Sequence, residues 1–150
     1  MESFRHLKVW QRAHALTLKV YQLAAALPDC ERFGISAQLR SASGSIGANI
    51  AEGCGRRNSR AGNGDLIRCL HIAMGSSTEL EYWLLLAHDA GLISEADYRA
   101  LANDVVELQR MLARFIARLR ELDRFRRRRR PSQAHKLSSS QASAFAPRAD

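Results

Sequence analysis

The sequence is poor in features that would interrupt helices or build strands. Proline occurs three times, and β-branched residues rarely gather into runs. The longest unbroken apolar run, near YWLLLA, is far too short to span a membrane. The first residues, MESFRHLKVWQR, hold no apolar segment, so we expect no secretory signal. These scarcities favour one all-α domain, for which 150 residues are sufficient.

Metal and nucleophile motifs are also missing from the sequence. Its three cysteines, Cys30, Cys54 and Cys69, form no CxxC pair of the kind that binds zinc, and their odd number fits no disulfide framework. There is no Glu-x-x-His pair, which a di-iron bundle would require, and no GxSxG nucleophile motif. We therefore expect a protein of the reducing cytoplasm with no metal, no cofactor and no enzymatic activity.

A regular apolar rhythm is what the sequence does contain. Apolar residues recur at alternating steps of three and four, the spacing of helices that pack side by side in a bundle. The predicted seams run from Val9 to Leu27, Ile35 to Gly53, Leu66 to Ala87 and Leu101 to Leu122. Strict alternation places Leu23, Asn49 and Phe115 at seam positions.

The residues between these segments are typical of helix ends. Pro28 follows the first segment and ends it. The glycines and asparagines of GCGRRNSRAGNG predict a loop before the third helix, which Asp65 would help to start. Gly91 suits the end of the third helix, and Ser94 with Asp97 forms a capping-box variant at the start of the fourth.

Four such helices predict an antiparallel up-down four-helix bundle about 30–40 Å long. We place this bundle in residues 1–123. After Asp123 the rhythm is lost, and RFRRRRR leads into a stretch rich in serine, alanine and glutamine. We therefore expect residues 124–150 to form a disordered, arginine-rich tail.

Positive charge is concentrated in that C-terminal region. The whole chain carries a net charge of +8. Residues 124–150 hold eight basic residues and one acidic residue, a net charge of +7, which leaves +1 for residues 1–123. The predicted bundle is therefore nearly neutral, and bulk charge alone does not make it a nucleic-acid-binding domain.

The stretch SGSIGANIAEGCGRRN, residues 43–58, has enough glycine to resemble a phosphate-binding loop. No lysine follows the glycines as a P-loop requires, and GxGxxG does not occur. Gly44 to Gly47 match the GXXG of KH domains, but that loop belongs to an α+β fold and no strand is evident here. The favoured interpretation is a helix with polar residues set into its packed side.

Two sets of polar residues lie at helical spacing beside the seams. Ser45, Asn49 and Glu52 form one stripe on the second helix, and Ser76 and Glu79 form a matching pair on the third. A buried amide or carboxylate must find hydrogen-bond partners, so we expect Asn49 and Glu52 to bond across helices, to Ser76 or Glu79. This network either locks the packing and register, or it has a ligand-binding or catalytic role.

The third segment is apolar on both sides of its seam. A helix of a monomeric bundle needs one apolar stripe, and a wider stripe favours burial against a further partner. We therefore expect the protein to self-associate. The flanking residues are Ile67, Met74 and Leu85 on one side, and Ile72, Trp83 and Leu86 on the other.

Three stretches, FRHLKVWQRAHALTLKVYQLAAALP, LRSASGSIGANIAEGCGRRN and IAMGSSTELEYWLLLAHDAGLIS, resemble the four-helix-bundle family described as 23S rRNA intervening-sequence proteins, over roughly residues 4–122. The most specific part is the pattern SI-x-x-N-I-A-E-G-x-G-R, filled by Ser45, Ile46, Asn49, Ile50, Ala51, Glu52, Gly53, Gly55 and Arg56. The resemblance implies a cytosolic homopentameric ring. It also implies a relation to the accessory variability proteins of diversity-generating retroelements, which assist a reverse transcriptase and bind nucleic acid.

Arginines supply the candidate nucleic-acid contacts, because the planar guanidinium pairs well with phosphate. One group lies in and after the loop that follows the second helix, and the other is the run in the predicted tail. The candidates are Arg56, Arg57, Arg60, Arg68, Arg126, Arg127, Arg128, Arg129 and Arg130. The run would bind RNA or DNA with little sequence preference and a steep salt dependence, or it would serve only as a solubilising tail.

These features predict a non-enzymatic, oligomeric protein that binds RNA or scaffolds a ribonucleoprotein. The alternative is a protein-interaction scaffold that recruits a partner such as a reverse transcriptase, with no nucleic-acid binding by the bundle. An enzyme that uses Asn49 and Glu52 is a third, weaker hypothesis.

Overall fold

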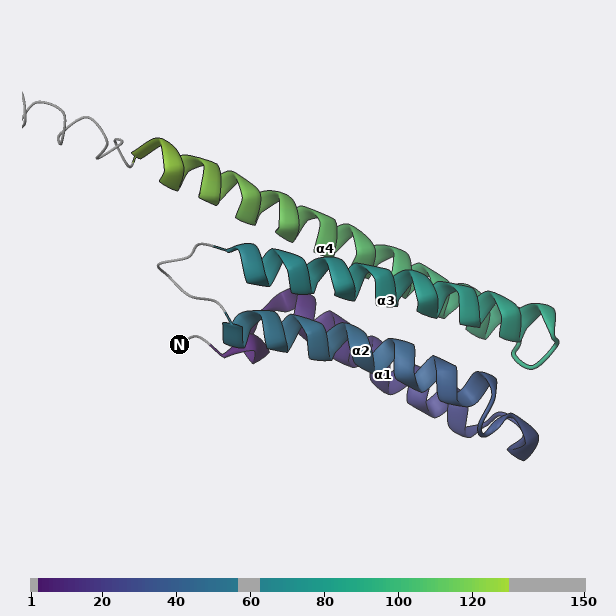
Figure 1. The fold of residues 1–150 in the computed structure, drawn as a ribbon. Coiled ribbons are helices and arrows are strands. Elements are labelled where there is room, and N and C mark those ends of the chain that lie inside the picture. The colour runs from purple at the N-terminus through teal and green to yellow at the C-terminus, as the bar shows by residue number, and fades with distance from the viewer. Residues whose placement is uncertain (1–2, 57–62, 130–150) are drawn as a thin grey trace, which may run out of the picture.

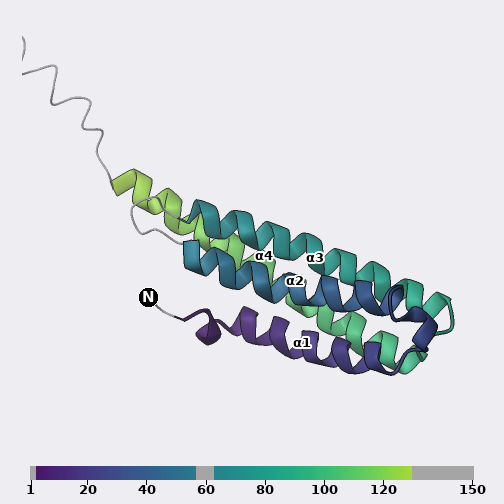
Figure 2. The ribbon, with the colours of Figure 1, turned by 60° about the horizontal axis from the view of Figure 1, so that its bottom comes forward.

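The computed structural model describes residues 3–56 and 63–129 of the chain, and these residues form helices and no strand (Figure 1). Successive long helices run antiparallel, so the predicted up-down four-helix bundle is confirmed (Figure 2). The elements are η1 Phe4–His6, α1 Lys8–Ala25, η2 Asp29–Glu31, α2 Ile35–Arg56, α3 Gly64–Asp89 and α4 Glu95–Arg129.

Each helix packs against its two neighbours in the order α1, α2, α3, α4 and back to α1. The apolar residues of the four seams meet in one core, which includes the fully buried Leu16, Leu39, Leu80 and Leu108. Burial of a leucine side chain contributes about 1.5–3 kcal/mol, so these seams supply the main stabilisation of the bundle.

The seam positions shift by one residue in three helices. Ala24, Ile50 and Ile116 are buried where strict alternation predicted Leu23, Asn49 and Phe115, which are half-buried, so the centre of each seam lies one residue further along than predicted. An ideal straight helix has 3.6 residues per turn and drifts by about 20° per heptad relative to a strict alternation. Two successive steps of four, from Ala42 through Ile46 to Ile50 and from Leu108 through Leu112 to Ile116, bring the buried stripe back toward the core.

The ends of α3 and α4 that meet at the turn between them follow the predicted chemistry, whereas α2 continues through Arg56 into the stretch predicted as a loop. Ser94 Oγ accepts a hydrogen bond from the Asp97 backbone N–H at 3.0 Å and donates one to the Asp97 carboxylate at 2.6 Å, which confirms the capping box. Gly91 has φ +69°, and the following Leu92 N–H reaches back to the Ala87 carbonyl at 2.9 Å. A side chain with a Cβ rarely adopts this φ, so glycine ends α3 here.

Helix α4 is longer than predicted. It continues through Arg129, so the expectation that residues 124–129 would be disordered was wrong. Arginine has a high helix propensity, and a positive charge in the last turn interacts favourably with the negative end of the helix dipole. Residues 130–150, the rest of the predicted tail, lie outside the described residues.

Helices α2 and α3 make the most extensive contact, while α1 and α4 make the least. Gly53 of α2 is buried against α3, where an added Cβ would lie 2.8 Å from Cys69 Cβ. Between α1 and α4, ion pairs supplement the packing: Lys19 Nζ lies 2.7 Å from Asp104 Oδ2, and Arg12 Nη2 lies 2.9 Å from Asp104 Oδ1.

Candidate nucleic-acid interface

One end of the bundle brings together three of the predicted basic segments. Helices α2 and α4 finish there and α3 begins there, as both views of the ribbon show (Figures 1 and 2). We call it the basic end. It places Arg56, Arg68 and the final turns of α4 on neighbouring elements, although these residues are far apart in the sequence.

Arg56 occupies the last turn of α2 and is exposed. Its Nη2 lies 2.6 Å from Glu52 Oε1, one turn earlier on the same helix. Exposed pairs of this kind contribute at most about 1 kcal/mol, so the pairing leaves the guanidinium available to a phosphate. The other loop candidates, Arg57 and Arg60, lie outside the described residues.

Arg68 lies near the start of α3 and is also exposed. Within the described part of the chain it makes no ion pair with a carboxylate. One turn further on, His71 Nε2 lies 2.8 Å from Arg120 Nη2, which links α3 to α4. The first two turns of α3 therefore stand beside the basic part of α4.

The strongest charge at this end belongs to α4. Residues 118–129 contain seven arginines and only two acidic residues, Glu121 and Asp123. We call residues 124–129 the α4 arm; they hold five arginines and Phe125, and every side chain among them is exposed. The candidates Arg126, Arg127, Arg128 and Arg129 all belong to this arm, whereas Arg130 lies outside the described residues.

A pair of hydrogen bonds marks the point where the arm leaves the bundle. The Asp123 carboxylate accepts one from the Asn63 side-chain Nδ2 at 2.9 Å and one from the Asn63 backbone N–H at 3.2 Å. Asn63 is only 1% exposed and immediately precedes α3. The link therefore ties α4 to the start of α3 immediately before the arm begins.

The opposite end of the bundle is acidic. It holds the connections between α1 and α2 and between α3 and α4, residues 26–34 and 88–99. The acidic residues there are Asp29, Glu31, Asp89, Glu95 and Asp97, against Arg32 and Arg99. The bundle is thus electrically polarised along its length, which would direct a polyanion to the basic end.

The polar network between α2 and α3 is built differently from the prediction. Ser45 Oγ and Ser76 Oγ share a hydrogen bond of 2.9 Å across the two helices. Asn49 joins this network through its own helix, because its Nδ2 donates to the Ser45 carbonyl at 2.8 Å and to Ser45 Oγ at 3.1 Å. Serine, rather than asparagine, therefore makes the bond between helices.

The two glutamates predicted to cross between helices bond within their own helices. Glu52 pairs with Arg56, and Glu79 accepts a hydrogen bond from Trp83 Nε1 at 3.3 Å. Both carboxylates are exposed. Water solvates an exposed carboxylate, so nothing forces either one to find a buried partner, and that part of the prediction was wrong.

The described residues contain neither a metal-binding cluster nor a membrane-spanning helix. Within residues 3–56 and 63–129, no group of three or more histidine, cysteine or acidic residues could hold a metal ion. No helix in these ranges combines the length and apolarity needed to cross a bilayer. Cys69 is buried against α2, Cys54 is half-buried and Cys30 is exposed.

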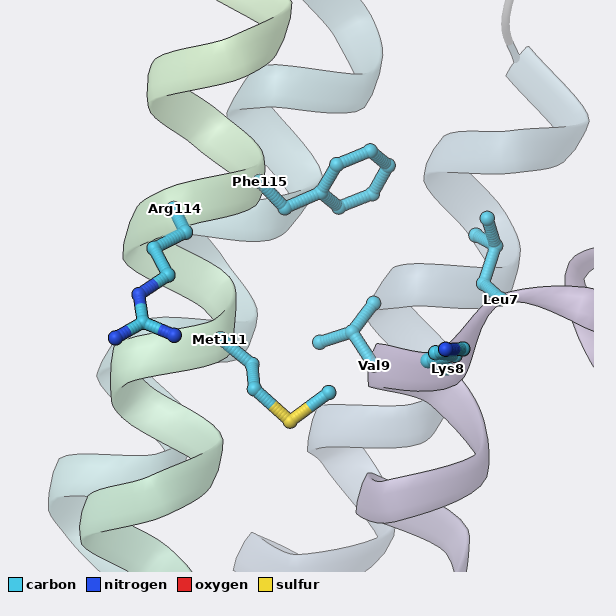
Figure 3. Close-up of a pocket in the computed structure, with 6 residues that line it drawn as sticks. All are labelled: Leu7, Lys8, Val9, Met111, Arg114 and Phe115. Carbon is cyan, nitrogen blue, oxygen red and sulfur yellow. The ribbon is translucent and has the colours of Figure 1, made fainter.

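Two surface hollows were not foreseen from the sequence. One is an apolar groove of about 300 Å³ between the start of α1 and α4 (Figure 3), lined by Leu7, Lys8, Val9, Met111, Arg114 and Phe115. The other, of about 190 Å³, lies on α4 and is lined by Glu121, Arg124, Phe125 and Arg128. The only sequence signal for the second was Phe125, the one aromatic residue inside the arginine run.

Comparison with protein families identifies the bundle. The model of the family described as 23S rRNA-intervening sequence protein matches residues 5–114. The chain belongs to this family. The assignment confirms the resemblance inferred from the sequence, and the matched region contains the Ser45–Ser76 network and the whole interface between α2 and α3.

A solved structure that is similar to this chain agrees with the fold. The chain is similar to a Bacteroides thetaiotaomicron protein of unknown function from the S23 ribosomal protein family, whose crystal structure was determined at 1.70 Å. The two share 27% identity with a TM-score of 0.62, over 72% of this chain and 97% of that one. A search of curated proteins found no match.

The matched region ends before the most basic part of the chain. Arg56 and Arg68 lie inside residues 5–114, but the α4 arm and the hollow around Phe125 lie beyond them. The basic end therefore combines two arginines from the family region with an arm that follows it.

Proposed function

We propose that this member of the 23S rRNA-intervening sequence family is a non-enzymatic cytoplasmic protein that assembles into a ring and binds nucleic acid, RNA in particular. The observation that carries the proposal is the convergence of Arg56, Arg68 and the α4 arm at one end of a bundle whose other end is acidic. Several guanidinium groups on one surface are the usual means of holding a phosphate backbone.

Self-association supports the same function through avidity. Several copies of a modest basic surface act together on one strand, which raises affinity without new contacts. The outer face of α3 offers apolar area for such assembly, because Ile72, Tyr82 and Leu85 remain exposed on the single chain. The resemblance implies five copies in the ring.

A second candidate function is a scaffold for a protein partner, such as a reverse transcriptase. The exposed apolar side chains favour it, because those of Leu18 and Tyr21 on α1 add to the ones on α3. On this alternative, the bundle binds no nucleic acid and the arm is only a polycationic extension.

A salt titration of binding to a structured RNA separates the two functions. Three full-length proteins are compared: the wild type, a variant with Arg126 to Arg129 changed to Gln, and the double variant Arg56→Gln/Arg68→Gln. Glutamine keeps helix propensity and removes charge. For single-stranded regions, we expect the slope of log K against log salt to fall by about 0.7 for each phosphate contact that is lost.

The outcomes decide between the candidates. Weakened binding in both variants supports nucleic-acid binding by the basic end as a whole. If only the arm variant loses binding to RNA, the bundle is a scaffold and the arm alone binds the RNA. No salt-dependent binding by the wild type at low salt would overturn the proposed function.

A further inference from the structure

Phe125 is an exposed aromatic residue in the most basic part of the protein. Its side chain is 53% exposed, and together with Glu121, Arg124 and Arg128 it lines the hollow of about 190 Å³ on α4. Residues 121, 125 and 128 are spaced at four and three, so they share one side of the helix. The hollow therefore combines an aromatic side chain, Phe125, with two arginines and one carboxylate.

The bundle itself gives no reason for this phenylalanine. The apolar stripe of α4 becomes more exposed as it leaves the body, from the buried Leu119 to Leu122 at the surface and then Phe125. The Asp123 carboxylate is bonded to Asn63, the residue that precedes α3, immediately before the arm begins. Phe125 is not among the described residues that form the core or pack against it, so the packing of the body does not account for it.

The charged side chains around Phe125 indicate what kind of molecule covers its ring. A second α4 arm would bring two sets of five arginines together, which is repulsive. The Glu121 carboxylate lies 2.9 Å from Arg118 Nη1, and the five arginines of the arm outnumber this single negative charge. The complementary occupant is flat and apolar in the part that covers the ring, and it carries negative charge within reach of the arginines.

An unpaired nucleotide has this chemistry. Its base stacks on an aromatic face, and its phosphates pair with guanidinium groups. We propose that the α4 arm binds single-stranded nucleic acid by stacking a base on Phe125, with Arg124 and Arg128 on the flanking phosphates. This inference rests on the proposed function and deepens it by naming the substrate class. A duplex keeps its bases stacked inside. Its phosphates can contact the arginines, but its bases cannot stack on Phe125.

The test compares one strand in two forms. Binding of a 12-nucleotide fluorescent RNA of mixed sequence is measured alone and annealed to its complement, with full-length wild type and the Phe125→Leu variant. Leucine keeps the helix and much of the apolar volume but removes the aromatic face. The matched control is Phe33→Leu, because Phe33 is also exposed, at 88%, and also lies beside an arginine, but at the acidic end.

The expected result is a loss confined to the single strand. Phe125→Leu should weaken binding of the single strand about 5- to 100-fold, and it should change duplex binding by less than about twofold. Phe33→Leu should change neither. With 2-aminopurine in the strand, the wild type should quench its fluorescence by stacking and Phe125→Leu should not.

Three results would overturn the inference. These are equal effects of Phe125→Leu on the single strand and the duplex, no effect on either, or a change in the number of assembled copies that accounts for the loss. In all three, salt-dependent binding by the wild type would leave the proposed function standing. Failure of the wild type to bind either form at low salt would instead remove the proposed function.

Discussion

At the scale of single residues, the contact between α2 and α3 depends on a glycine, Gly53, which has no side chain. A Cβ added at Gly53 would lie 2.8 Å from Cys69 Cβ, 2.9 Å from Leu66 Cδ1 and 3.3 Å from Leu66 Cα. Glycine in a helix costs about 1 kcal/mol relative to alanine, so its presence here needs a compensating gain. Close approach of α2 to α3 supplies that gain, because it brings Ser45 within hydrogen-bond distance of Ser76.

We predict that Gly53→Ala destabilises the protein by about 1–3 kcal/mol, because overpacking against the α3 backbone outweighs the gain in helix propensity. The matched control is Gly44→Ala on the same helix, where an added Cβ meets no atom within 4 Å. That control should stabilise the protein by about 0.5–1 kcal/mol. Urea denaturation followed by circular dichroism measures both, and a stabilising Gly53→Ala would disprove the close contact.

At the scale of elements, the turn between α3 and α4 is held by charged side chains at the acidic end. His88 Nε2 of α3 lies 2.7 Å from Glu95 Oε2 at the start of α4, and the His88 ring stacks on Tyr98 with centroids 4.7 Å apart. Arg99 also pairs with Glu95 from one turn later. The Arg99 hydrogen bond, helped by the charges of Arg99 and His88, lowers the pKa of Glu95 below its ordinary value of 4.5.

This lowered pKa predicts a pH dependence of stability. A carboxyl group with a depressed folded-state pKa stabilises the protein above its unfolded value, and that contribution is lost as the pH falls through the folded value. Wild type should therefore exceed Glu95→Gln in free energy of unfolding above pH 4.5, and the difference should shrink as the pH falls further. Denaturation curves at several pH values measure this.

NMR titration of the Glu95 carboxyl provides an independent check. In Arg99→Gln, its pKa should move back toward 4.5, because the largest cause of the shift is gone. An unchanged pKa in that variant would show that Arg99 does not hold the carboxylate in solution.

At the scale of the whole molecule, α3 presents more apolar surface than one bundle buries. Of the six residues flanking its seam, Ile67, Met74 and Trp83 pack partly against the core. Ile72 and Leu85 remain exposed at 45% and 43%. Packing within the single chain therefore accounts for part of the broad apolar stripe of α3. The rest of the stripe is available to contact another copy.

We predict that Leu85→Glu shifts the proposed ring toward monomers, because a carboxylate buried between copies has no partner. The helix content should be unchanged, since the side chain lies outside the core. The matched control is Ala113→Glu, which places the same charge on an exposed position of α4. Native mass spectrometry counts the copies. An assembly unaffected by Leu85→Glu would place the contact between copies elsewhere.

The sequence was sufficient to predict the four helices, the cap of α4, the glycine that ends α3 and the antiparallel order. Each of these features depends on residues that are neighbours in the chain: the apolar rhythm, Ser94 with Asp97, and the φ that Gly91 allows. It was also sufficient for the family, because the pattern around Asn49 is contiguous. It was insufficient for the partners of Glu52 and Glu79, since helical spacing does not show whether a polar stripe faces a neighbour or water.

The remaining features required the packed bundle, for reasons of geometry. A straight helix drifts relative to a strict alternation of steps of three and four, and this drift buries Ile50 in place of Asn49. The bond between Asn63 and Asp123 joins residues far apart in the chain and defines where the arm leaves the body. Antiparallel packing gathered Arg56, Arg68 and the arm at one end, because in an up-down bundle α2 and α4 finish at the same end, where α3 begins.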